Sequence, residues 1–88
     1  MSWIKMGNDY KPKIGEELLA TFSDYPEGVG TLYSCTKVTD TYFTVIEIKN
    51  INTTGVTTIP EAERKTYEIL FSSIPIINLH RKFNFGRV

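Results

Sequence analysis

Residues that build covalent and metal-bound sites are scarce in this sequence. Its 88 residues include one cysteine, Cys35, and one histidine, His80. A single cysteine excludes an internal disulfide and a zinc site made of several cysteines, and it is more typical of a reducing compartment. If Cys35 lies on a strand, Tyr33 is its neighbour on the same face, which favours a small core residue over a reactive thiol. We therefore expect no metal and no cofactor.

Long hydrophobic runs are also missing. No apolar stretch approaches the roughly 20 residues that a membrane-spanning helix needs. The first residues, MSWIKMGNDYKPK, have neither the apolar core nor the cleavage site of a signal peptide. These features predict a soluble, cytoplasmic protein that does not act at a membrane.

Catalytic residue patterns are not found either. Glu16 and Glu17 are adjacent, so on a strand they point to opposite faces and cannot work as one carboxylate pair. The segment EGVG, residues 27–30, is too short for a phosphate-binding glycine loop. We predict that the protein is not an enzyme.

The composition is sufficient for one small folded domain over residues 1–88. Hydrophobic residues make up 41% of the chain, which is enough for a core. A core of this size leaves little surplus stability, so we expect a monomer or a small homo-oligomer that is stabilised further by a partner.

Residues 14–33, IGEELLATFSDYPEGVGTLY, fit either a helix or a pair of strands. A helical apolar stripe would end at Phe22 after about nine residues, which is short for a stable helix. As a strand, residues 17–22 alternate, and SDYPEG then supplies the residues of a turn. We predict strand, turn, strand here. Gly30 in the second strand indicates a bulge or a close backbone approach.

The segment TKVTDTYFTVIEIKNI, residues 36–51, carries the clearest strand pattern. Residues 39–41 form a tight turn, and the residues after it alternate between apolar and polar. Residues 52–63, NTTGVTTIPEAE, fit a long polar loop, and such a loop in a small domain is often functional or mobile.

Residues 60–73 again allow two structures. Thr58 and Glu61 fit a capping box, and four apolar residues follow at helical spacing, which would make the fold α+β. The same residues alternate as a strand, followed by a short turn and a last strand over 76–83. We favour strands throughout. The prediction is an all-β protein, a small antiparallel barrel of five or six strands.

Two resemblances follow from these patterns. The strands over residues 14–82 resemble an SH3-like barrel, and EILFSSIPIINL is similar to the strand, single 3₁₀ turn and last strand that close such barrels. The acidic-aromatic signature of peptide-binding SH3 domains is missing, so recognition of proline-rich ligands is not implied.

The beginning of the chain resembles small phage and prophage proteins of unknown function. Trp3 and Ile4 are followed by a Pro-x-x-Gly strand entry at Pro12 and Gly15, and then by two leucines. This resemblance implies a small accessory protein of a phage or mobile element, one that blocks a host enzyme or defence system in the host cytoplasm.

Charge is balanced overall but uneven along the chain. Ten basic and ten acidic residues give a net charge of zero, which argues against a non-specific nucleic-acid binder. Residues 14–30 hold acids and no base, whereas residues 76–88 hold bases and no acid. Tyrosine and tryptophan are favoured contact residues at protein interfaces. The chain has six of them: Trp3, Tyr10, Tyr25, Tyr33, Tyr42 and Tyr67.

We therefore predict a non-enzymatic binding protein that occludes a host protein with a basic surface. Its predicted contact residues are the acids of residues 14–30 and an aromatic anchor: Glu16, Glu17, Asp24, Glu27 and Tyr25.

Two alternatives remain. One is a nucleic-acid-binding barrel, with cations and rings that alternate near the C-terminus: Arg81, Lys82, Phe83, Phe85 and Arg87. The other is an oligomeric protein that sequesters a nucleotide-sized ligand.

Overall fold

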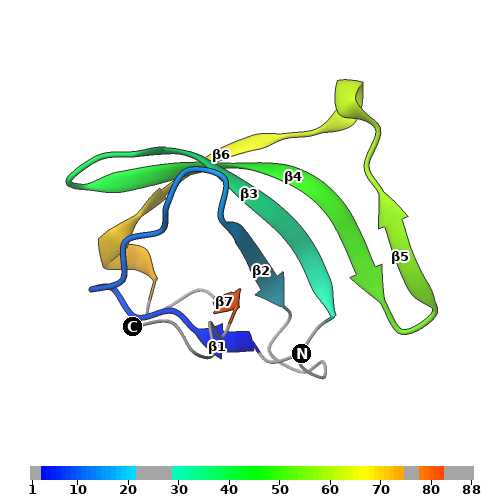
Figure 1. Ribbon diagram of the computed structural model, residues 1–88, viewed down its shortest axis with the longest axis horizontal. Coiled ribbons are helices and arrows are strands. Elements are labelled where there is room, and N and C mark those ends of the chain that lie inside the picture. Colours follow the sequence, from blue (N-terminus) through cyan, green and yellow to red (C-terminus); the bar gives the residue numbers. More distant parts are fainter. Residues whose placement is uncertain (1–2, 22–28, 75–77, 83–88) are drawn as a thin grey trace.

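The computed structural model describes residues 3–21, 29–74 and 78–82 (Figure 1). These residues form one antiparallel sheet of seven strands and two 3₁₀ turns, so the predicted all-β class is confirmed. The prediction of five or six strands is wrong, since there are seven among the described residues. The strands are β1 (Trp3–Lys5), β2 (Glu17–Thr21), β3 (Gly30–Val38), β4 (Tyr42–Asn52), β5 (Gly55–Thr58), β6 (Thr66–Leu70) and β7 (Leu79–Lys82); the turns are η1 (Glu61–Glu63) and η2 (Phe71–Ser73).

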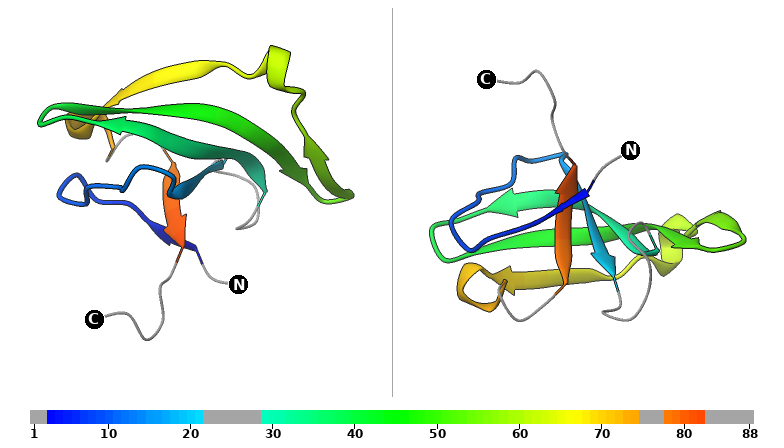
Figure 2. Two further views of the ribbon diagram at one scale, coloured as in Figure 1. Left: turned by 45° about the horizontal axis from the view of Figure 1, so that its top comes forward. Right: turned by 90° about the horizontal axis from the view of Figure 1, so that it is seen from below.

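The strand order explains the shape of the sheet. Neighbouring strands run β1-β7-β2-β3-β4-β5, and β6 also pairs with β4. The sheet curls, so that β1, β7 and β2 lie beneath the layer of β3, β4 and β6 (Figure 2). No pairing between the described strands joins β6 to β1, and the curled sheet is therefore open on that side.

The β3–β4 hairpin forms where the alternating pattern predicts it. Its tight turn is held by Thr39, whose Oγ1 accepts the N–H groups of Tyr42 and Thr41 at 3.1 and 3.3 Å. The side chain thus satisfies backbone donors that the turn would otherwise leave unpaired. The predicted turn at residues 39–41 is confirmed.

The core lies on the concave face of the sheet. It contains Met6, Leu18, Cys35, Phe43, Val45, Phe71, Ile74 and Leu79. The rings of Phe43 and Phe71 are 5.2 Å apart, so η2 covers the end of β4. Cys35 is 1% exposed and is a core residue, as predicted.

Strand β2 is covered on both faces. Leu18 faces the core, and Leu19 points the other way, yet both are fully buried. Leu19 lies opposite Leu32 of β3 and His80 of β7. The predicted strand is therefore confirmed over residues 17–21, although both of its faces are apolar.

Gly30 makes the close backbone approach that the sequence predicts. It pairs with Thr21 at the end of β2, and its φ is +157°. A Cβ atom at this position would lie 1.9 Å from the carbonyl oxygen of Ala20. Only glycine fits here without moving β2 away from β3.

The loop prediction for residues 52–63 is wrong in part. Residues 55–58 form β5, which turns back from Asn52 and pairs with the end of β4. Both β5 and β6 lie on the edge of β4 that β3 leaves free, and residues 60–65 form an excursion between them. Figure 1 shows the β4–β5 hairpin projecting from the sheet.

The alternative of a helix over residues 60–73 is also wrong. Pro60 is extended and makes no capping hydrogen bond through a side chain. Tyr67 and Ile69 instead lie opposite Val45 and Phe43 of β4. Pairing with β4 supplies hydrogen bonds and core contacts together, and this tertiary gain outweighs the helical propensity of the segment.

Candidate functional site

A cavity of about 570 Å³ lies at the open side of the sheet. It reaches four consecutive residues of β6, at positions 67–70. Successive side chains of a strand point to opposite faces, so a cavity that touches four in a row follows the backbone edge of that strand. The remaining lining residues come from the end of β2, from the start of β7 and the residue before it, from β3 and from η2: Ala20, Thr21, Leu79, Asn78, Tyr33 and Ser73.

The edge of β6 beside this cavity carries backbone groups that no described strand pairs with. The carbonyl of Lys65 accepts the N–H of Glu47 at 3.0 Å, and the N–H of Phe71 donates to Thr41 at 3.1 Å. Residues of an antiparallel strand bond to a given neighbour at every second position. The N–H and C=O groups of the even-numbered residues of β6 therefore point away from β4, and within the described part of the chain no strand pairs with them.

Two tyrosines form the floor of the cavity. The rings of Tyr33 and Tyr67 meet edge to face, with centroids 5.9 Å apart. The hydroxyl of Tyr67 donates to Oε2 of Glu47 at 3.2 Å. Burial raises the pKa of the Tyr33 phenol, and the neighbouring Tyr67 and Glu47 raise that pKa further. Tyr33 is therefore neutral at physiological pH and can donate a hydrogen bond.

The outer rim of the cavity combines apolar and acidic groups. Leu70 is 51% exposed, which is high for a large apolar side chain. Glu68 lies on the same face of β6 as Leu70 and is the charged residue among the described lining residues. The cavity thus offers apolar surface and phenol groups, and the carboxylate of Glu68 lies at its rim on the convex face of β6.

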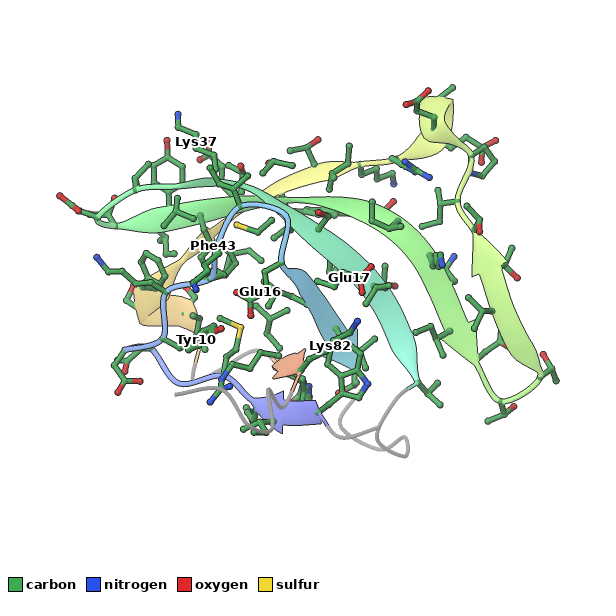
Figure 3. The ribbon with its side chains drawn as sticks, in the orientation of Figure 1. Tyr10, Glu16, Glu17, Lys37, Phe43 and Lys82 are labelled. Carbon is green, nitrogen blue, oxygen red and sulfur yellow. The ribbon has the colours of Figure 1, made fainter. Side chains whose placement is uncertain are left out.

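The predicted acidic contact residues do not gather at this cavity. Glu16 accepts the Tyr10 hydroxyl at 2.6 Å and the N–H of Lys13 at 2.9 Å, so it holds the chain before β2 in place. Glu17 forms a 2.7 Å ion pair with Lys82. Figure 3 labels Tyr10 and Glu16 of the first contact and Glu17 and Lys82 of the ion pair. The other predicted contact residues lie outside the described residues: Asp24, Tyr25 and Glu27.

The predicted basic residues also have local partners. The guanidinium of Arg81 lies 4.5 Å from the centre of the Tyr10 ring, and Lys82 contacts Glu17. The acidic and basic segments of the sequence therefore meet between β2 and β7. Three further residues of the nucleic-acid alternative lie outside the described residues: Phe83, Phe85 and Arg87.

Other kinds of site are not seen in residues 3–21, 29–74 and 78–82. These residues contain no group of three or more His, Cys, Asp and Glu side chains that could hold a metal ion. They also form no helix that is long and apolar enough to cross a membrane. No family model, curated protein or solved structure matches the chain.

The cavity is only partly indicated by the sequence. Its residues come from elements that are far apart along the chain, and pattern analysis does not place them together. One usable feature is in β6, where Glu68 and Leu70 share one face. A single exposed leucine is common on protein surfaces, so this feature alone does not identify a contact surface.

Proposed function

We propose that this protein is a non-enzymatic binding protein that holds a segment of a partner protein in the cavity beside β6. The observation that supports this most is the cavity itself, which lies along an unpaired strand edge. Its volume of about 570 Å³ falls in the usual range of roughly 300–1,000 Å³ for binding sites. A partner held there is occluded from its own contacts, in agreement with the inhibitory role expected from the sequence.

The charge of the residues that line the cavity favours some classes of partner over others. Glu68, on the convex face of β6, attracts a basic segment, and Glu47, on the concave face, accepts the hydroxyl of Tyr67. The described lining residues include no base that could neutralise a phosphate. This arrangement favours a neutral or basic protein segment over a nucleotide or a nucleic acid.

The biological setting of this function rests on the sequence resemblance. A small phage or mobile-element protein would meet a host enzyme or defence protein in the host cytoplasm. We also propose that the curled sheet is an opened form of an SH3-like barrel. Its support is the succession of β6, η2 and β7 along the chain.

Site-specific photo-crosslinking tests the proposed function. A benzophenone amino acid is placed at position 70, on the cavity rim, and in a control variant at position 56. Leu70 and Val56 are similarly exposed, at 51% and 60%, but Val56 lies on β5 and does not line the cavity. We expect a protease-sensitive adduct from position 70 alone in cells of the source organism. Equal adducts from both positions, or none from position 70, would contradict the proposal.

A further inference from the structure

We infer that the partner segment binds as an additional strand, antiparallel to β6, with an apolar residue toward the tyrosine floor and a basic residue opposite Glu68. The inference rests on the proposed function, because it assumes that the cavity binds protein. It adds the conformation of the bound segment and the pattern of its side chains.

The first support is the hydrogen-bonding capacity of the free edge. Thr66, Glu68 and Leu70 direct their N–H and C=O groups away from β4, as the alternation from Lys65 to Phe71 requires. Their spacing of about 6.6–6.8 Å is the repeat of every second residue in a strand, so an extended segment matches all three. An added strand of this kind gains its affinity from main-chain hydrogen bonds.

The second support is the way in which this edge is left accessible. Natural proteins protect free edges with proline, lysine or bulges. The sequence of β6, TYEIL, contains neither proline nor lysine. Among the described strands β5 also has an edge without a neighbour, but all four of its residues are exposed and the cavity does not extend to it.

The side chains of β6 determine the pattern that an added strand would need. Tyr67 and Ile69 share the concave face with the core, whereas Glu68 lies on the opposite face. Residues of the added strand that point to the concave face therefore meet Tyr33, Tyr67 and Leu79 and should be apolar. The residue paired with Glu68 lies on the convex face, where a lysine or arginine forms a favourable cross-strand pair.

Charge also argues against a second copy of this chain as the occupant. A two-fold symmetric pairing of two β6 edges, centred on the middle residue of the strand, places Glu68 opposite Glu68 of the other copy. Like charges directly opposite each other destabilise a strand pair. A basic segment of a different protein avoids this repulsion.

An NMR titration tests the inference with a defined probe. The probe is the peptide acetyl-Val-Thr-Val-Lys-Val-Thr-Val-amide, which places valines on one face and lysine in the centre of the other. Two variants of the ¹⁵N-labelled full chain are compared, Glu68→Ala and Glu68→Pro. Both lose the carboxylate, but only proline also removes the outward N–H, and neither alters a hydrogen bond to β4.

We expect the peptide to shift the amide signals of Thr66 and Leu70 in the wild type and in Glu68→Ala. Glu68→Pro should bind about tenfold more weakly than Glu68→Ala, as expected from the loss of one hydrogen bond. Equal affinity of the two variants would overturn the inference. So would the absence of any shift in the wild type at millimolar peptide, or shifts confined to other strands.

Modified peptides give a second measurement that needs no folded proline variant. In the antiparallel pairing the lysine amide faces β6 and the amides of the neighbouring valines face away. N-methylation of the lysine should abolish the shifts, and N-methylation of the next valine should leave them. If both methylated peptides bind equally while crosslinking at position 70 succeeds, strand addition is wrong and the proposed function stands. If crosslinking fails although the peptides behave as expected, the proposed function is wrong.

Discussion

Replacement of Gly30 by alanine is the sharpest test of the fold around the cavity. The new Cβ would lie 1.9 Å from the carbonyl oxygen of Ala20, and real Cβ contacts essentially never fall below 3.0 Å. The end of β2 must therefore move about 1 Å away from β3. A hydrogen bond of roughly 2.9 Å lengthened by that amount lies outside the accepted range. Because Ala20 and Thr21 line the cavity, its wall moves as well.

The expected loss in the free energy of unfolding follows from these changes. Loss of one or two backbone hydrogen bonds costs about 1 kcal/mol each, and alanine at a positive φ adds about 1 kcal/mol. The free energy of unfolding should fall by about 2–3 kcal/mol. A domain of this length has roughly 4–13 kcal/mol in total, and Tm falls by roughly 4–8 °C per kcal/mol. We expect Tm to drop by about 10–25 °C.

Gly55 provides a matched control for this experiment. Its φ of +147° is close to that of Gly30, but nothing lies within 4 Å of the position of its Cβ. Gly55→Ala should therefore cost only about 1 kcal/mol, from the backbone conformation alone. Both variants are measured by urea and thermal denaturation. Equal losses in the two variants would show that the close approach of β2 and β3 at Gly30 is not present.

Two further predictions concern tyrosines. Tyr10→Phe removes the hydroxyl that donates to Glu16 but keeps the ring beneath Arg81, so we expect a loss of about 1–2 kcal/mol in urea unfolding; an unchanged midpoint would contradict the role of Glu16. Burial raises the pKa of the Tyr33 phenol above its ordinary value of 10.0. The protonated phenol therefore contributes fully to the free energy of unfolding below pH 10, and this contribution is lost as pH rises through the folded-state pKa. The free energy of unfolding should therefore fall less steeply above pH 10 in Tyr33→Phe than in the wild type, and parallel curves would contradict this.

Much of the sheet could be predicted because alternation is a local property. The strands around Leu18 and Phe43 show a period of two, and the turn after Val38 contains residues that hold it by their own side chains. The close approach at Gly30 could also be predicted, since a glycine within a strand often marks a bulge or a place where another backbone comes near. These features depend on neighbouring residues and not on distant ones.

Other features depend on contacts that the sequence does not specify locally. Strand β5 is exposed at all four positions and exists because β4 extends far enough to pair with it. Its polar composition matches that of a loop, although the turn Asn-Thr-Thr-Gly at residues 52–55 and the β-branched residues after it are compatible with a hairpin. The cavity is the extreme case, because it exists only where β6, β2 and β7 come together.

The position of β7 has a consequence for how the protein is made. This strand is translated after the six other described strands, yet it fills the place between β1 and β2. During synthesis the edge of β2 that faces β7 stays unpaired, and Met6 and Thr21 lack the carbonyl groups of Leu79 and Asn78 that accept their N–H groups. The sheet is therefore completed only after translation has passed Lys82, in a late step that joins sequence-distant segments. Until that step, the edges of β1 and β2 are open to pairing with other nascent chains, which exposes the incomplete sheet to aggregation.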